Sequence, residues 1–555
     1  MLDAHKLKEI RERLADVPQR IATVAKVAQT SGMMWELSVP GMRALVKTLR
    51  AGAQNPSQVY RLHALNAPDK IALQWRDESI TFGEFNRRID SVASSFTRLG
   101  FGRGTSVVVM MKNRPEFLET TSGVTRMGGS AVAISWRSTV AELIYLATHC
   151  GARAIVFDAD LWPTVEQARK ELPNIQAFFT VGGRVKGCSH FDELLEGSTS
   201  FTEVAGAADD AAVVIYTSGT TGKPKGAVRK FPKDALPAAM RFLAETPMRV
   251  DDVHLAVCPL YHSTAIGFLT FTHLLGGTAV ILDEFKPEGF LAAVDRYGVT
   301  TTAVIPTMLH RVLGLDEDTL AKYNTRTLRA IFSGGAPLPG PLATQTMDHF
   351  GDILFNFYGA TETAIVTLAK PADLRAAPTT IGPAVPGNDI RLLDDAGREV
   401  RVGQVGELYV KNKMLVSGYH RDQSATRDSM KDGYFSVGDL ARKDRDGRYF
   451  IEGRKRDMVI SGGVNVYPAE VEGVLELHVS VAECAVVGVS DPEWGERVRA
   501  FVVRRIGHEL DEGELKAWTR ERLAGPKVPR DFVFLDALPR NPTGKVLKRE
   551  LRERR

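Results

Sequence analysis

One stretch near the middle of the chain constrains its fold and chemistry most strongly. The apolar run Ala211 to Tyr216 predicts a buried strand, and it leads directly into the sequence TSGTTGKPKG. Glycines let the backbone N–H groups of such a loop close around a polyphosphate, while hydroxyls donate further hydrogen bonds and lysines add positive charge. We therefore expect a phosphate-binding loop made of Thr217, Ser218, Gly219, Thr220, Thr221, Gly222 and Lys223.

The loop differs from the P-loop of the nucleoside-triphosphatases. That motif places four residues between its glycines and a hydroxyl residue after its lysine. Here two residues separate Gly219 from Gly222, and Pro224 follows Lys223. The spacing therefore argues against a P-loop NTPase.

The pattern of the rest of the chain indicates an α/β protein with more than one domain. A length of 555 residues exceeds the usual size of one domain. Short β-branched runs alternate with amphipathic helical patterns up to about Ile381, and short strands punctuated by glycine follow. The strands that we expect in the first part include 106–111, 154–157, 211–216, 279–282, 301–305 and 353–357.

Two helices have clear start and stop signals. Thr81 and Glu84 have the spacing of a capping box, as do Thr139 and Glu142, and each helix is followed by a glycine. The first helix is expected over 81–100, with Phe85, Ile89, Val92, Phe96 and Leu99 on its buried face, and the second over 140–150.

Composition excludes several classes of function. The net charge of +4 argues against nucleic-acid binding by bulk electrostatics. The four cysteines show no metal-ligand or disulfide spacing, and no secretory signal opens the chain, so we expect a cytoplasmic protein. The segment 253–282 lacks charged residues, but its proline, histidines and paired glycines predict a strand, a loop and a buried helix rather than a membrane span.

Five motifs in a fixed order resemble the acyl-adenylate-forming superfamily, and specifically its AMP-forming acyl-CoA synthetases. They are the loop at 216–226, SGGAPL at 333–338, FYGATE at 357–362, VGDL at 437–440 with GRKRDMVISGG at 453–463, and PRNPTGK at 539–545. The resemblance extends from about Pro56 to Arg555. It implies a helical extension at 1–55, a large multi-sheet AMP-binding domain at 56–455 and a small α+β lid domain at 456–555.

The resemblance implies a reaction in which ATP activates a carboxylic acid and CoA then takes the acyl group. ATP, Mg²⁺ and CoA are the expected cofactors. Glu362 would bind Mg²⁺ with help from Thr217, and Thr361 would contact the α-phosphate. Asp439 would accept hydrogen bonds from both ribose hydroxyls, with Arg454 beside it. The adenine pocket is expected to include Gly335, Ala336, Asn356, Tyr358 and Gly359.

The resemblance assigns roles to several further residues. Lys545 would stabilise the negative charge that develops during adenylation. His262 would line the acyl pocket and the approach of the thiol, although a histidine in an apolar stretch is also common in cores. Gly462 and Gly463 would border the path of pantetheine after the lid rotates. The family usually has Asp or Lys at the hinge, where this chain has Arg456, and commonly Tyr where it has Pro526.

The substrate is the least constrained part of this hypothesis. We expect a medium- to long-chain fatty acid, with the tunnel shaped by Thr264, Gly267, Ile305 and Thr307. The alternatives are an aryl or sterol-type acid, an acyl-AMP ligase that loads a carrier protein, and an acyl-binding or uptake protein without catalysis. An intact set of Glu362, Asp439, Arg454 and Lys545 argues against the last of these.

The first 54 residues lie outside the common core and are basic. The first fifty positions contain nine Lys and Arg residues and five acidic residues, and apolar residues recur at helical spacing. One interpretation is peripheral contact with an anionic membrane surface, at the inner face of the membrane. The other is a helical arm packed on the large domain or on another subunit, and the sequence leaves the oligomeric state open.

Overall fold

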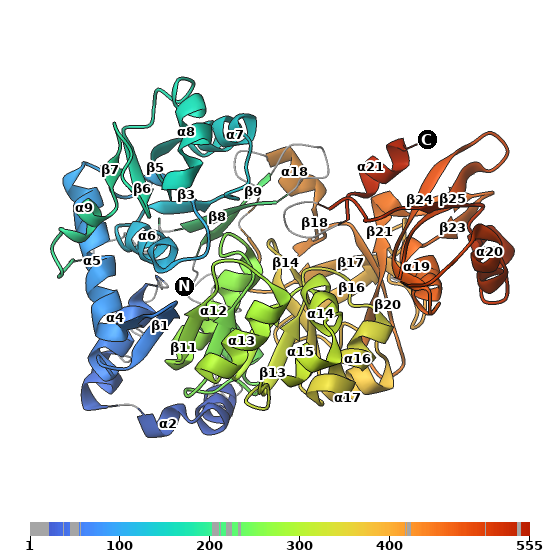
Figure 1. Cartoon of the computed structure of the whole chain (residues 1–555), viewed down its shortest axis with the longest axis horizontal. Coiled ribbons are helices and arrows are strands. Elements are labelled where there is room, and N and C mark those ends of the chain that lie inside the picture. The colour runs from blue at the N-terminus through green and yellow to red at the C-terminus, as the bar shows by residue number, and fades with distance from the viewer. Residues whose placement is uncertain are drawn as a thin grey trace, which may run out of the picture.

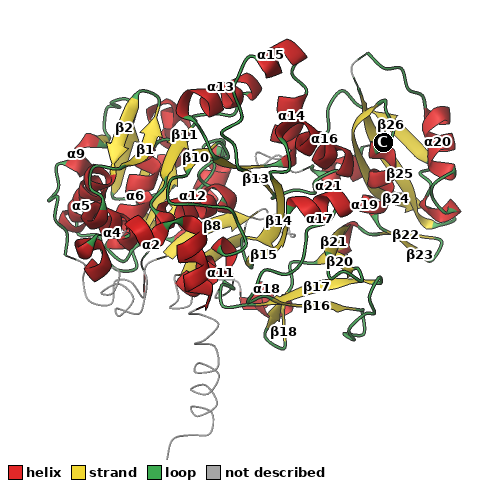
Figure 2. Ribbon diagram, turned by 90° about the horizontal axis from the view of Figure 1, so that it is seen from below, coloured by secondary structure: helices red, strands yellow, loops and turns green. Residues whose placement is uncertain are grey.

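The computed structural model describes residues 22–36, 38–44, 55, 57–202, 210, 212–217, 225–230, 235–416, 418, 423–505, 507–540 and 546–554. These residues form four sheets, of eight, seven, six and five strands. Figures 1 and 2 show the five-stranded sheet and its helices at the opposite end of the molecule from α4 and α5. The expected fold class, α/β with a large N-terminal domain and a small C-terminal domain, is confirmed.

The eight-stranded sheet is parallel in its interior. Only its two outermost strands, β2 and β15, pair in the antiparallel sense. Parallel strands are buried on both faces, which explains the near-continuous apolar runs of the sequence. In spatial order the strands are β15 (Ala364–Ala369), β14 (Leu354–Ala360), β13 (Ala330–Ser333), β12 (Thr301–Val304), β10 (Val253–Ala256), β11 (Thr278–Ile281), β1 (Ile71–Trp75) and β2 (Glu78–Thr81).

The seven-stranded sheet carries the strand that leads into the predicted phosphate loop. That strand, β8, pairs in parallel with β4 and antiparallel with β9, so that Thr217 lies opposite Lys225. In spatial order the strands are β7 (Ser189–His190), β6 (Ala177–Val181), β5 (Ala152–Asp158), β3 (Ser106–Met110), β4 (Ser130–Ala133), β8 (Ala212–Thr217) and β9 (Lys225–Lys230).

Helices fill the space between these two sheets and cover them. The largest apolar cluster joins Leu73 of the first sheet to Val107 of the second, with Phe85 and Phe117 from helices among them. The helices are α2 (Met33–Glu36), α4 (Gln58–Asn66), α5 (Phe82–Arg98), α6 (Pro115–Arg126), α7 (Val140–Cys150), α8 (Trp162–Arg169), α9 (Asp192–Leu195), α11 (Ala235–Leu243), α12 (Ser263–Leu275), α13 (Pro287–Tyr297), α14 (Pro306–Leu313), α15 (Glu317–Ala321), α16 (Gly340–Phe350) and α17 (Pro371–Ala376), with a short 3₁₀ helix at Ala159–Leu161.

The capping signals are located as predicted, with one difference. Thr139 and Glu142 form a complete capping box, and Gly151 ends α7 at a φ of 67°. At α5 the Thr81 side chain accepts a hydrogen bond from the Glu84 N–H. Four of the five residues on the predicted face of α5 are buried, but Leu99 is 50% exposed. The prediction for Leu99 is wrong because the helix ends at Arg98 and Leu99 turns out of it as the C-cap.

The C-terminal half forms two smaller sheets. The six-stranded sheet consists of β16 (Asp389–Leu393), β17 (Val405–Lys411), β18 (Met430–Lys431), β19 (Tyr434–Phe435), β20 (Asp439–Lys443) and β21 (Tyr449–Arg454), with α18 (Gln423–Asp428) beside it. The five-stranded sheet consists of β22 (Val459–Ser461), β23 (Val464–Val466), β24 (Val481–Asp491), β25 (Gly495–Arg504) and β26 (Asp531–Phe534), with α19 (Pro468–Glu476), α20 (Glu512–Arg520), α21 (Lys548–Glu553) and 3₁₀ helices at Lys455–Asp457 and Gly525–Lys527.

The described part of the N-terminal extension packs on the large domain. Residues 22–31 are helical, and Val27 is 1% exposed within a cluster that includes Phe242 and Phe268. Lys26 forms an ion pair with Glu245, and the Ser31 carbonyl accepts a hydrogen bond from Val250 N–H. For residues 22–44 these contacts support the second of our two interpretations, in which the N-terminal segment is a helical arm packed on the large domain. No helix among the described residues is long and apolar enough to cross a membrane.

Candidate active site

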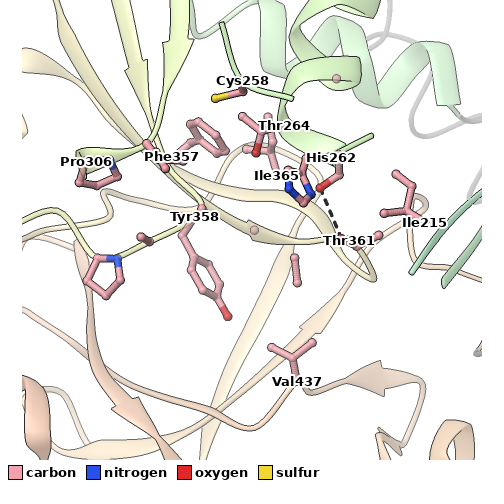
Figure 3. Close-up of a pocket in the computed structure, with 18 of the residues that line it drawn as sticks. Ile215, Cys258, His262, Thr264, Pro306, Phe357, Tyr358, Thr361, Ile365 and Val437 are labelled. Carbon is pink, nitrogen blue, oxygen red and sulfur yellow. Dashed lines mark hydrogen bonds between the residues drawn. The ribbon is translucent and has the colours of Figure 1, made fainter. Parts of the chain in front are cut away.

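A cavity of about 2130 Å³ lies between the large domain and the lid. The C-terminal ends of parallel strands open into it, as is usual for ligand sites of open α/β sheets. Strand β14 and the loops after β12 and β13 contribute one side, β20 and β21 a second, and α19, β24 and α21 of the lid a third. Figure 3 shows the part of the cavity around Tyr358 and Thr361.

Three predicted nucleotide contacts form a connected group. The Tyr358 hydroxyl donates a 2.7 Å hydrogen bond to Asp439 Oδ2, and Arg454 Nε lies 3.2 Å from Asp439 Oδ1. Asp439 and Arg454 face each other on the paired strands β20 and β21. Burial and the neighbouring Asp439 carboxylate raise the pKa of Tyr358 well above its ordinary value, so the phenol stays a hydrogen-bond donor. All three residues line the cavity.

The residues predicted for adenine lie along the same wall. Asn356 is 3% exposed, and its side-chain amide donates a 2.9 Å hydrogen bond to the Thr380 carbonyl, which fixes its orientation. Gly335 has a φ of 78°, a conformation that residues with a side chain rarely adopt. Gly335, Ala336 and Gly359 all border the cavity.

The turn between β14 and β15 presents Thr361 and Glu362. Ala360 N–H donates to the Thr363 hydroxyl at 3.0 Å, and Ala364 has a φ of 57°, so the turn is tightly fixed. Ser263 Oγ lies 3.4 Å from Thr361 Oγ1, as the dashed line in Figure 3 shows. Glu362 is 6% exposed and lines the cavity. The donors gathered here are oxygen atoms, a set that fits a hard divalent cation.

A mostly apolar chamber adjoins this turn. His262 is the N-cap of α12, and its ring packs on that of Tyr261 with centroids 4.3 Å apart. Thr264, Phe357 and Ile365 point into the same space in Figure 3. A Cβ atom placed on Gly335 would lie 3.6 Å from Ile305 Cγ2 and 3.9 Å from Thr264 Oγ1, so these walls meet. The residues that we predicted to shape the acyl site, Thr264, Gly267, Ile305 and Thr307, all border the cavity.

Several predicted residues lie outside this description. Ser218, Gly219, Thr220, Thr221, Gly222, Lys223 and Lys545 are not among the described residues, and Thr217 is described only as the last residue of β8. Arg540 and Val546, which flank the segment that holds Lys545, do line the cavity. Gly462 and Gly463, in the turn between β22 and β23, are absent from the described lining of the cavity. Gly462 packs against the ring of Trp494, and a side chain at position 462 would collide with that ring.

Charged lid residues that we did not predict as site residues also line the cavity. Lys548 Nζ lies 2.6 Å from Glu472 Oε1, and Arg540 lies 3.1 Å from Glu483. Burial together with Glu472 and Glu483 raises the pKa of Glu476 to about 8. Glu472 and Glu476 belong to α19, Glu483 to β24 and Lys548 to α21, and these four form no short motif, whereas Arg540 lies within the PRNPTGK motif. Among the described residues no group of three or more His, Cys, Asp or Glu side chains is arranged to hold a metal ion.

Comparisons with known proteins agree with this geometry. The family model described as AMP-binding enzyme matches residues 60–420, and that described as AMP-binding enzyme C-terminal domain matches 470–545. A feruloyl-CoA synthase of an Amycolatopsis species is 34% identical over 493 residues, 88% of this chain and 96% of the relative. The fatty acid–[acyl-carrier-protein] ligase ScoC of Streptomyces coeruleorubidus is 30% identical over 506 residues, 90% of this chain and 96% of the relative.

A solved structure extends the comparison to three dimensions. The anthranilate CoA ligase AuaEII, in complex with anthranoyl-AMP, superposes with a TM-score of 0.84 at 25% identity, covering 90% of this chain and 97% of that chain. The similarity therefore includes both the large domain and the lid.

Proposed function

We propose that this chain, which belongs to the AMP-binding enzyme family and is an AMP-forming acid–CoA ligase, uses an apolar monocarboxylic acid of the aromatic class as its substrate. The names of the feruloyl-CoA synthase and the anthranilate CoA ligase support the aromatic class. The observation that carries the proposal is the chamber at Thr264, Ile305, Phe357 and Ile365, whose walls hold no charged side chain at these positions. A second carboxylate packed against these four side chains would lose hydration without a charged partner among them, which disfavours dicarboxylic acids whose second group must lie there.

The chemistry consists of two displacements. In the first, a carboxylate oxygen bonds to the α-phosphorus of ATP, the bond to the β-phosphate oxygen breaks, and pyrophosphate leaves. In the second, the sulfur of CoA bonds to the acyl carbon and AMP leaves. Neither step needs a covalent bond to the protein, so the protein contributes position and electrostatic stabilisation.

The residues of the cavity suit the nucleotide. We assign the ribose to Asp439, because Tyr358 and Arg454 hold its carboxylate in place while it remains on the cavity wall. We assign the base to the wall of Gly335, Ala336, Asn356 and Gly359. The loop 217–223 and Lys545 are assigned to the phosphates from their sequence motifs.

Glu362, with Thr361 and Ser263 beside it, provides the oxygen donors at the phosphate end. We assign Mg²⁺ to Glu362, with Thr217 as a helper from the sequence motif; the ion would neutralise phosphate charge when bound. We likewise propose the domain boundaries at 55 and 455 and the hinge at Arg456 from the sequence motifs.

A panel of acids tests the proposal. Purified protein receives ATP, Mg²⁺, CoA and one acid from a benzoate-type, cinnamate-type, linear saturated or dicarboxylic set, and AMP and thioester are both quantified. We expect the aromatic monocarboxylic acids to give the highest kcat/KM and the dicarboxylic acids to give none. Linear saturated acids as the best substrates would support our sequence-based expectation of a fatty acid instead. AMP release without thioester would favour transfer to a carrier protein.

A further inference from the structure

The strand that leads into the predicted phosphate loop extends beyond its neighbour in the sheet. Among the described residues, β8 pairs with β4 only as far as Ile215. Tyr216 and Thr217 continue past this point and pair with Gly226 and Lys225 of β9, the edge strand of the sheet. A two-stranded ribbon is only marginally stable without further packing. The base of the loop therefore needs support from outside the sheet.

Helix α7 supplies this support through Tyr216. The Tyr216 hydroxyl and His149 Nδ1 of α7 lie 2.8 Å apart and form a hydrogen bond, and the two rings meet edge to face with centroids 5.8 Å apart. Tyr216 also packs against the apolar cluster that includes Leu143 and Leu146 of α7. Tyr145, one turn before His149 on the same helix, stacks on the imidazole with centroids 5.5 Å apart, which restricts the orientation of the imidazole ring.

The Tyr216 ring also lies across strand β9. A Cβ atom built on Gly226 would lie 3.1 Å from Tyr216 Cε1 and 3.2 Å from Tyr216 Cζ, closer than side chains normally approach. A side chain at position 226 would therefore push the ring away. Tyr216 thus connects β8, β9 and α7 at the point where the loop begins, and it lines the cavity there.

We propose that the hydrogen bond between Tyr216 and His149 positions the base of the phosphate loop for the β- and γ-phosphates of ATP, and that both are positioning residues. The inference rests on the proposed function, because the loop 217–223 is assigned to these phosphates from its motif. A displacement of the ribbon at its base displaces the groups that the loop presents to the phosphates. AMP lacks the β- and γ-phosphates, so the hydrogen bond should support the binding of ATP and not that of AMP.

The test measures the dissociation constants of ATP and AMP by calorimetry, with Mg²⁺ present and without an acid substrate. Tyr216→Phe removes the hydroxyl and keeps the ring, and His149→Ala removes its partner. Each change should weaken ATP binding by about fivefold, the effect of losing one hydrogen bond, and should change AMP binding by less than about twofold. His149→Asn, whose amide oxygen can take the place of Nδ1 as an acceptor, should restore most of the ATP affinity.

A double variant and a matched control show whether this hydrogen bond is the cause. Tyr216→Phe combined with His149→Ala should bind ATP about as weakly as either single variant, since both changes remove the same interaction. Tyr60→Phe is the control, because the Tyr60 hydroxyl lies 3.2 Å from His273 Nδ1 and neither residue belongs to the described lining of the cavity. This variant removes the same kind of hydrogen bond from the core and should leave both dissociation constants unchanged. Far-ultraviolet circular dichroism identifies any variant that fails to fold.

Lys223→Ala separates the positioning inference from the proposed function. If Lys223→Ala weakens ATP binding and Tyr216→Phe does not, the positioning inference fails and the assignment of the loop to the phosphates stands. Equal losses of ATP and AMP affinity in Tyr216→Phe would show a general structural role and would also overturn the inference, as would losses that add in the double variant. If neither Lys223→Ala nor Tyr216→Phe changes ATP binding, the phosphate assignment fails, and the positioning inference fails with it.

Discussion

The Tyr358 hydroxyl donates a 2.7 Å hydrogen bond to Asp439 Oδ2, although 81 positions separate the two residues in the chain. The bond connects β14 of the eight-stranded sheet with β20 of the six-stranded sheet at the edge of the cavity. Since burial keeps the phenol protonated, this donor is available across the physiological pH range. The carboxylate that we assign to the ribose is thus oriented before the nucleotide arrives.

Tyr358→Phe removes the donor and retains the ring. A hydrogen bond to a charged group contributes about 1.5–3 kcal/mol, so we expect KM for ATP to rise by about tenfold or more while KM for the acid changes little. Tyr434→Phe is a matched control, because Tyr434 donates to Asp389 on the six-stranded sheet and is absent from the described lining of the cavity. Steady-state kinetics with ATP and acid varied separately measure both values. A similar rise in both variants would show that the effect is structural.

Glu362→Gln tests the assignment of the cation. The amide keeps the shape of the side chain but replaces an anionic oxygen with a neutral one, so activity should fall steeply at limiting Mg²⁺. Glu407→Gln is the control, because Glu407 also lines the cavity but already binds Ser436 at 2.8 Å and Lys455 at 3.2 Å. Titration of pyrophosphate release with Mg²⁺ compares them. An unchanged titration for Glu362→Gln would remove this residue from the metal site.

Lys545→Ala should lower the rate of adenylation by at least about a hundredfold and largely spare thioester formation from supplied acyl-adenylate. The reason is that Lys545 is assigned to the phosphate during adenylation, and rotation of the lid would carry it away before CoA attacks. Lys548→Ala is the neighbouring control: Lys548 is engaged with Glu472 at 2.6 Å, so its loss should affect adenylation much less. Rapid-quench measurement of each half-reaction separates the two. Equal losses of Lys545→Ala in both steps would contradict the assignment.

Most of the fold was predictable because it depends on local patterns. The strand runs and the capping residues of α5 and α7 are located where the sequence indicated. Leu99 was assigned to the wrong environment because the helical period alone does not say where the last turn ends.

The site was predictable only where residues form a contiguous motif. The group of Tyr358, Asp439 and Arg454 comes from two such motifs, but its internal hydrogen bonds depend on how two sheets meet. The cavity-lining residues of α4 and α11, such as Leu62 and Phe242, belong to no motif, because they reach the cavity only through the packing of their helices. The identity of the acid is therefore the property that the sequence constrains least.

The packed N-terminal helix gives a stability prediction. Val27 is 1% exposed, whereas Val24 on the same helix is 51% exposed. Val27→Asp would bury an unpaired polar group and should lower the free energy of unfolding by about 3 kcal/mol, while Val24→Asp should change it by less than about 0.5 kcal/mol. Denaturant unfolding measures both. Equal effects would mean that the helix does not pack on the large domain in solution.

Three buried histidines make stability depend on pH. Desolvation lowers the pKa of His254 to about 3 and those of His63 and His273 to about 4, while an unfolded histidine titrates near 6.5. Below about pH 6.5 the unfolded chain therefore binds more protons than the folded chain, and each histidine destabilises the fold as the pH falls. The cost approaches about 1.4 kcal/mol per pH unit and per histidine until the pKa of the folded state is reached.

His254→Gln isolates one of these contributions. His254 Nδ1 lies 3.0 Å from Thr301 Oγ1, and an amide can retain a hydrogen bond to that hydroxyl. The loss of unfolding free energy between pH 7 and pH 5 should be smaller in the variant by about 2 kcal/mol. Burial raises the pKa of Glu119 to about 8, which opposes the histidines, but this contribution is the same in both proteins and cancels. The control is His349→Gln, at an exposed position of α16, which should keep the pH dependence of the wild-type unfolding free energy. An identical pH dependence in the wild type, His254→Gln and His349→Gln would mean that His254 is not held neutral by burial.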